Sequence, residues 1–159
     1  MRAVTTWILI AVAATALVGV ASAGAGSERP RPLYASARGD TVRATLGSYC
    51  VADDVGASVC SDSAYPLAVR GHLDVSPPRL VVFRTHDTQI KRLSARLLRV
   101  DGNDIEYLRR IDVHRAYSHG ARWRADMPRN LRGANRIDVF VRYMDGIGDA
   151  DFWVKIAER

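Results

Sequence analysis

The stretch Gly47-Ser48-Tyr49-Cys50 … Cys60-Ser61-Asp62 holds the only two cysteines of this 159-residue chain, ten positions apart. Asp, Gly and Ser residues lie between the cysteines, and these residue types form turns and loops. We interpret Cys50 and Cys60 as one disulfide that closes a short loop. In the chain-entropy account, such a crosslink contributes about 2.8 kcal/mol for a loop of about 11 residues. This is a large share of the roughly 5–15 kcal/mol that stabilises an ordinary domain.

Two other uses of the cysteines stay open, a redox pair and a metal site. Redox pairs usually have only two residues between their cysteines and require a lowered thiol pKa. A tetrahedral zinc site requires two further ligands at matched spacing. The sequence shows neither pattern, so the structural disulfide is the favoured interpretation.

The residues before the first cysteine alternate in the manner of a half-buried strand. Over 41–49, Val42, Ala44 and Leu46 alternate with polar neighbours, which is the period of two that a strand requires. The same kind of pattern predicts strands at 67–75, 92–100, 121–127, 136–144 and 151–156, and a continuous apolar run predicts one at 79–84. The strands at 136–144 and 151–156 form a hairpin around a glycine-rich turn.

Three of these segments carry a finer expectation. The run 79–84 has four successive apolar residues, which suits a strand buried on both faces. In 92–100 the apolar positions change phase, which indicates a β-bulge, and Asp101-Gly102 closes the strand as a turn. A helix over 92–100 is the less favoured alternative. The segment 104–117 fits either strands or a short helix capped by Asp104.

The number and spacing of these short strands predict the fold class. Seven or more strands with turn signals between them, and no long periodic helix after residue 23, favour a β-sandwich or a small barrel. We therefore expect an all-β domain with one intradomain disulfide, preceded by a signal peptide.

The N-terminus has the three parts of a secretory signal. Arg2 precedes a fourteen-residue apolar run over 7–20, and Ala21-Ser22-Ala23 provides a small-residue cleavage site. We predict a signal peptide at 1–23, a flexible linker at 24–38 and a β-sandwich domain at 39–159. An uncleaved membrane anchor is the alternative, although a spanning helix needs about 20 apolar residues. Localisation is then secreted or extracytoplasmic, at the cell envelope.

Two segments resemble a group of small, secreted, mostly uncharacterised bacterial proteins. The first is Gly47-Ser-Tyr-Cys50, a short loop and then Cys60-x-Asp62. The second is the strand 136–143 followed by Gly148-Asp149-Ala150-Asp151-Phe152, which is similar to the closing hairpin of that group. The resemblance implies an immunoglobulin-like β-sandwich of about seven strands. It implies no catalytic residues.

The charge of the chain restricts its partners. The chain has 23 basic and 17 acidic residues, and without the signal peptide the net charge is +5. Single arginines recur along the expected strands, at Arg70, Arg79, Arg84, Arg92, Arg96, Arg99, Arg136 and Arg142. Because export is hard to reconcile with nucleic-acid binding, a protein or an anionic envelope component is the expected partner. Contact with the membrane is expected only through an uncleaved signal.

The sequence contains no common catalytic or nucleotide-binding motif, so we expect a protein that is not an enzyme and uses no cofactor. A small hydrolase, with a catalytic Ser, His and Asp dispersed along the sequence, stays open as an alternative. The expected function is a non-enzymatic binding domain that holds a protein or an envelope polymer. Its candidate binding residues are Tyr49, Trp123, Trp153 and Arg142, because aromatic and arginine side chains anchor interfaces.

The alternative function is a metal-handling extracytoplasmic domain that uses His and Asp side chains. Its ligands would come from the four histidines, at 72, 86, 114 and 119, or from Asp145, Asp149 and Asp151. The aspartates lack the spacing of an EF-hand loop, and a histidine site needs at least two of the side chains to converge. We therefore predict no metal-binding residues.

Overall fold

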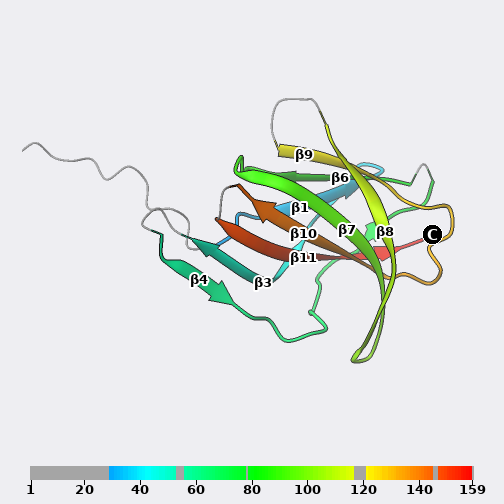
Figure 1. The fold of residues 1–159 in the computed structure, drawn as a ribbon. Helices are drawn as coiled ribbons and strands as arrows, with labels where there is room; N and C mark the ends of the chain where they lie inside the picture. The colour runs from blue at the N-terminus through cyan, green and yellow to red at the C-terminus, as the bar shows by residue number, and fades with distance from the viewer. Residues whose placement is uncertain (1–28, 53–55, 78, 117–120, 145–146, 159) are drawn as a thin grey trace, which may run out of the picture.

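The computed structural model describes residues 29–52, 56–77, 79–116, 121–144 and 147–158. These residues form an all-β structure with no helix (Figure 1). The strands are β1 (Leu33–Ala37), β2 (Asp40–Arg43), β3 (Thr45–Ala52), β4 (Ser58–Ser61), β5 (Leu73–Asp74), β6 (Leu80–Thr85), β7 (Ile90–Asp101), β8 (Asp104–Arg115), β9 (Ala121–Asp126), β10 (Arg136–Tyr143) and β11 (Gly148–Ala157).

The strands form one curled sheet in the order β2-β1-β6-β9-β8-β7-β10-β11-β3-β4, and each neighbouring pair is antiparallel. The long strand β8 joins the two halves of the sheet. Its residues up to Ile111 pair with β7, and those from Asp112 onward pair with β9. Figure 1 shows β8 lying along β7 and bending over toward β9. We call β2, β1, β6 and β9 half A, and β7, β10, β11, β3 and β4 half B.

The chain also joins the two halves at Ala44, between β2 and β3. The Ala44 N–H donates a hydrogen bond to the Leu33 carbonyl oxygen at 2.8 Å, and the next residue enters half B. The continuous strand expected over 41–49 is therefore split, because the chain turns a corner of the sheet there. Leu46 still faces the core as its alternation predicts.

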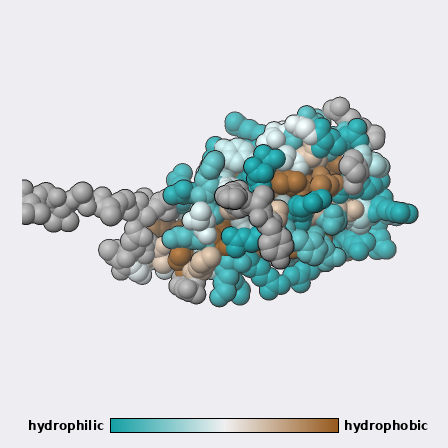
Figure 2. All heavy atoms as spheres, turned by 90° about the horizontal axis from the view of Figure 1, so that it is seen from above, coloured by the Kyte–Doolittle hydropathy of each residue, from teal (hydrophilic) through white to brown (hydrophobic). Residues whose placement is uncertain are grey.

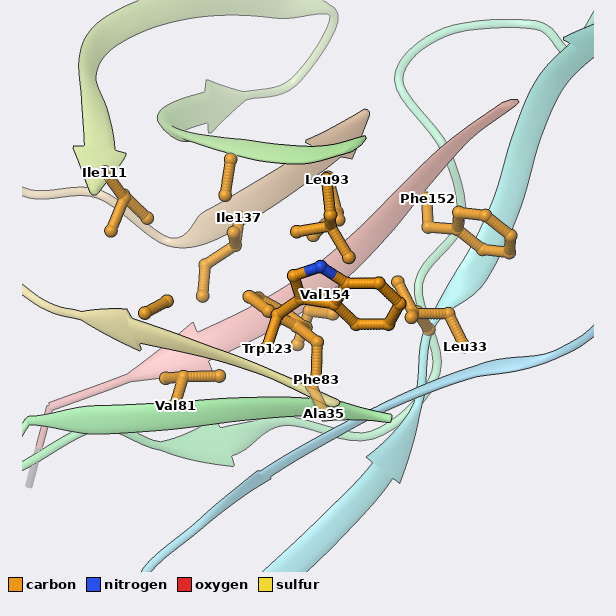
Figure 3. Close-up of a cluster of buried hydrophobic side chains, with 14 of the residues drawn as sticks. Leu33, Ala35, Val81, Phe83, Leu93, Ile111, Trp123, Ile137, Phe152 and Val154 are labelled. Atoms are coloured by element: carbon orange, nitrogen blue, oxygen red, sulfur yellow. The ribbon is translucent and has the colours of Figure 1, made fainter. Parts of the chain in front are cut away.

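The two halves pack face to face over one hydrophobic core. Figure 3 shows Phe83 and Trp123 of half A pointing toward Val154 of half B. Apolar residues at every second position supply this core, as the period of a strand requires. Its fully buried members include Leu33, Val81, Phe83, Leu97, Ile137, Val139, Val141 and Val154.

A second, smaller cluster lies on the opposite face of half B. It contains Leu67, Leu98 and Trp153, and Val69 packs against it. The expected strand at 67–75 is therefore wrong except at Leu73–Asp74, where β5 pairs parallel with the end of β11. Leu67 and Val69 of this segment pack onto the outside of the sheet, whereas Leu73 and Val75 are buried in the main core.

Further features differ from the sequence expectation, and one open alternative is resolved. The linker expected at 24–38 is too long, because Leu33–Ala37 forms β1 and its alternate residues are buried in the core. Strand β6 is fully buried on one face only, because Leu80, Val82 and Arg84 on its other face are half-buried or exposed. Of the two alternatives left open for 104–117, the strand is correct, because Asp104–Arg115 forms β8. With β1 and the split at Ala44, the described residues contain eleven strands, more than the expected number of about seven.

Other expectations are confirmed. Cys50 and Cys60 form a disulfide between directly paired residues of β3 and β4. The bulge expected within 92–100 lies between Leu97 and Leu98, where the pairing of β7 with β8 shifts. Strands β10 and β11 form the expected hairpin.

The double variant Cys50→Ser/Cys60→Ser tests the contribution of the crosslink. We expect its free energy of unfolding to fall by about 2–3 kcal/mol, because the unfolded chain regains the entropy of the open loop. Urea unfolding measures this, and a reducing agent should destabilise the native protein equally while leaving the variant unchanged. An unchanged free energy of unfolding would show that the disulfide does not stabilise the domain.

Candidate functional site

The outer face of half A carries four arginines that neighbouring strands bring together. Arg43 lies on β2, Arg84 on β6, and Arg122 and Arg124 on β9, and all four are exposed. We call these four residues the basic face. Arg84 lies directly opposite Arg122, and Tyr34 of β1 pairs with both Arg84 and Arg43. The arginines point outward because they alternate with the core residues Val81, Phe83, Ala121, Trp123 and Ala125.

No carboxylate forms an ion pair with the basic face in the ranges that the structure describes. The ion pairs found there involve Arg79, Arg96 and Arg99, which lie elsewhere. Like charges directly opposite each other on adjacent strands destabilise a sheet. The acidic residues of this outer face, Asp112 and Asp126, lie opposite each other at one end of β8 and β9. Asp126 lies two residues from Arg124 on the same face of β9, so these carboxylates lie near one arginine of the basic face and farther from the opposed pair Arg84 and Arg122.

A hollow of about 400 Å³ lies beside the opposed arginine pair. Arg84 and Arg122 line it together with Tyr34, Thr41 and His86. Each of these five side chains carries a hydrogen-bond donor, and none is a carboxylate. The hollow therefore presents donors and positive charge to whatever enters it.

The structure does not bring the four predicted binding residues together. Trp123 is only 3% exposed and lies in the main core, and Trp153 is 2% exposed in the smaller cluster. Tyr49 is half-buried and packs against the core. Arg142 is exposed on the outer face of half B, opposite Arg92 on one side and Asp149 on the other.

Sequence reasoning missed the arginines of β9. Their signal was the alternation Arg122-Trp123-Arg124, in which a buried tryptophan fixes both neighbours on the outer face. The sequence did identify Arg84 as one of the single arginines on strands. It held no sign that Arg84 and Arg122 are opposite each other, because β6 and β9 are far apart in the chain.

The outer face of half B contains a buried, paired aspartate. Asp138 is 4% exposed, and the Arg96 Nε and Nη2 atoms donate hydrogen bonds to its Oδ2 at 3.0 and 2.6 Å. Burial raises the pKa of Asp138, while Arg96 and a hydrogen bond from the Trp153 side chain act in the opposite direction. The Arg96 guanidinium also lies 4.3 Å from the centre of the Tyr107 ring. Trp153 therefore has a structural partner here, in keeping with its burial.

A second aspartate, Asp151, binds the segment around Tyr65 that covers the outer face of half B. The Tyr65 hydroxyl donates a hydrogen bond to Asp151 Oδ2 at 2.8 Å, and the Tyr65 ring packs 5.3 Å from the Trp153 ring. Burial raises the pKa of Asp151, and the charge of Asp138 raises it further. Gly47 makes room for this carboxylate, since a Cβ atom at residue 47 would lie 2.2 Å from Asp151 Oδ2.

The described residues include three of the four histidines, together with Asp149 and Asp151. Among the described residues, no group of three His, Cys, Asp or Glu side chains is placed to hold a metal ion. His72, His86 and His114 are exposed on separate elements. His119 and Asp145 lie outside the described residues.

Comparisons with protein-family models, with curated proteins and with solved structures give no match to this chain. Within residues 29–158, less the short gaps given above, no helix is long and apolar enough to cross a membrane.

The variant Gly47→Ala tests the close approach of β3 to Asp151. Its added methyl group overlaps the carboxylate, so we expect a loss of about 1–3 kcal/mol in the free energy of unfolding. In an Asp151→Ala background the same change should cost clearly less, because most of the clash has been removed. A double-mutant cycle by urea unfolding measures the coupling, and an equal cost in both backgrounds would contradict the packing described here.

The raised pKa of Asp151 predicts how stability changes with pH. A carboxyl whose pKa is higher in the folded state binds its proton more readily when folded, so its contribution to stability grows as the pH falls. Between about pH 7 and pH 4, acidification should therefore favour the native protein relative to Asp151→Asn. Urea unfolding of both proteins across this range measures the difference, in which carboxyls that are unaffected by the substitution cancel. The opposite sign would mean that the folded environment lowers the pKa of Asp151.

Proposed function

We propose that this protein is a non-enzymatic binding domain of the bacterial cell envelope, and that its basic face holds an anionic envelope component. The observation that carries the proposal is the unneutralised pair of Arg84 and Arg122, directly opposite each other on adjacent strands. Within the described residues neither has an ion-pair partner. An anionic ligand lying across the two strands would remove their repulsion and gain two charge-assisted contacts.

The spacing of the strands favours an extended ligand with repeated negative charges. Neighbouring strands lie about 4.8 Å apart, so the backbones at Arg84 and Arg122 are separated by about that distance. Arg43 lies two strands from Arg84, which is about 10 Å on the same spacing. A polymer crossing half A would meet one arginine after another, which suits an envelope polymer better than a single small ion.

The surface supports binding by charge. Figure 2, which looks down on the molecule from above the view of Figure 1, shows mainly hydrophilic residues, with hydrophobic ones in small separate areas. A ligand held mainly by charge should be sensitive to salt, because exposed charges are screened over about 8 Å at physiological ionic strength.

Export forms part of the same proposal. The Cys50–Cys60 disulfide is compatible with an oxidising, extracytoplasmic location. The signal peptide at 1–23 lies outside the described residues and belongs to the proposal on the strength of its sequence. The immunoglobulin-like sandwich also stays a proposal, supported by the face-to-face packing of halves A and B around one core.

Two matched double variants test the basic face. Arg84→Gln/Arg122→Gln removes the opposed pair on half A, and Arg92→Gln/Arg142→Gln removes the opposed pair on half B. Both lower the net charge by the same amount. We expect the first to weaken binding to purified bacterial envelope fragments on the order of tenfold and the second to weaken it less than about twofold.

Co-sedimentation at several salt concentrations measures both affinities. If the two variants lose equal affinity, net charge alone explains the loss. If neither variant loses affinity, the basic face does not bind the envelope fragments. Thermal melting of both variants checks that the fold is retained.

A further inference from the structure

We propose that the hollow lined by Arg84 and Arg122 binds a phosphate group, so that the ligand of the basic face is a phosphate-bearing polymer. This inference rests on the function proposed above and names its ligand. It is carried by the chemistry and size of the hollow, and by where the exposed apolar side chains lie.

The donors of the hollow suit a tetrahedral oxyanion. One guanidinium fork satisfies a planar carboxylate with two parallel hydrogen bonds. This hollow has two guanidinium groups, from opposite residues of β6 and β9, together with the hydroxyl-bearing residues Tyr34 and Thr41 and the imidazole of His86. Phosphate oxygens project in several directions and accept bonds from several donors at once. The set therefore matches phosphate better than carboxylate.

The volume of the hollow suits more than a bare ion. At about 400 Å³ it falls in the range of about 300–1,000 Å³ that is typical of small-molecule sites. A phosphate together with the sugar or polyol unit that carries it would fit. Arg43 and Arg124 lie on the same outer face but do not line the hollow, so they are placed to meet neighbouring phosphates of the same chain.

The surface favours a polymer over a lipid bilayer. Proteins that bind at the membrane interface add buried apolar area to their charge attraction. In the described part of the chain the exposed large hydrophobic side chains are Tyr65, Tyr107 and Met144. None of them belongs to half A: Tyr107 lies where β8 pairs with β7, Met144 follows β10, and Tyr65 packs on half B. The basic face therefore offers charge without an apolar anchor.

Replacing arginine by lysine separates phosphate recognition from charge. Arg84→Lys/Arg122→Lys keeps both positive charges but removes the forked donors. Arg92→Lys/Arg110→Lys makes the same change at two exposed arginines of β7 and β8 outside the basic face and is the matched control. The probes are two soluble polyanions, inorganic polyphosphate and poly-glutamate, with binding to the full-length protein measured by calorimetry at roughly physiological salt of 0.15 M.

We expect the native protein to prefer polyphosphate. The Arg84→Lys/Arg122→Lys variant should lose on the order of tenfold in affinity for polyphosphate and less than about twofold for poly-glutamate. The control variant should change both affinities by less than about twofold. Melting temperatures of all three proteins establish that the variants fold.

The outcomes separate this inference from the proposed function. If the native protein binds both polyanions equally and the hollow variant changes neither, phosphate recognition is wrong while binding by the basic face stands. If the native protein binds neither polyanion, both proposals fail. Vesicles containing phosphatidic acid form the third arm. If the native protein binds them as tightly as polyphosphate or more tightly, the hollow binds lipid headgroups, and the proposal of a polymer ligand is wrong.

Discussion

The structure depends on one constraint: a single hydrogen-bonded sheet has to cover its own apolar face. It does so by curling, with β8 pairing with β7 along its first part and with β9 along its second. The chain closes the arrangement at Ala44, where it passes from half A to half B. Both connections keep backbone groups paired while one core forms between the halves. The disulfide joins β3 to β4 at the edge of half B. It adds to the stability that the core provides and does not take the place of the core.

The curl leaves two outer faces, one on half A and one on half B. They differ in how far their side chains are covered and paired. On half B, the segment that contains Tyr65 and Leu67 covers Trp153, and the carboxylates of Asp138 and Asp151 each have a hydrogen-bonded partner. Both carboxylates of that face are therefore satisfied, whereas the Arg136 Nε atom on the same face is buried without a hydrogen-bond partner within the described ranges. On half A nothing among the described residues covers or neutralises the opposed Arg84 and Arg122. Like charges directly opposite each other lower the stability of a sheet, and the ligand proposed for the basic face would offset that cost.

Local patterns in the sequence predicted strands well and pairings poorly. The phase change near Leu97 marked a real bulge, and the alternation over 136–143 marked the central strand β10. Strand β1 escaped detection because Pro30 and Pro32 precede it and read as a linker. The alternation over 67–75 includes Leu67 and Val69, which are buried on the outside of the sheet, and Leu73 and Val75, which are buried in the main core. A period of two cannot distinguish these two kinds of burial. The basic face depends on which distant strands are neighbours, and no short-range pattern contains that information.

The register of half A places Arg84 directly opposite Arg122 on the outside of the sheet. A slip of one residue would turn every side chain of the strand to the other face. Interstrand nuclear Overhauser contacts in the labelled protein measure this register directly. The account predicts cross-strand contacts between residues 84 and 122 and between 34 and 84. Contacts that instead pair residue 84 with 121 or 123 would contradict the account, because an arginine would then face the core.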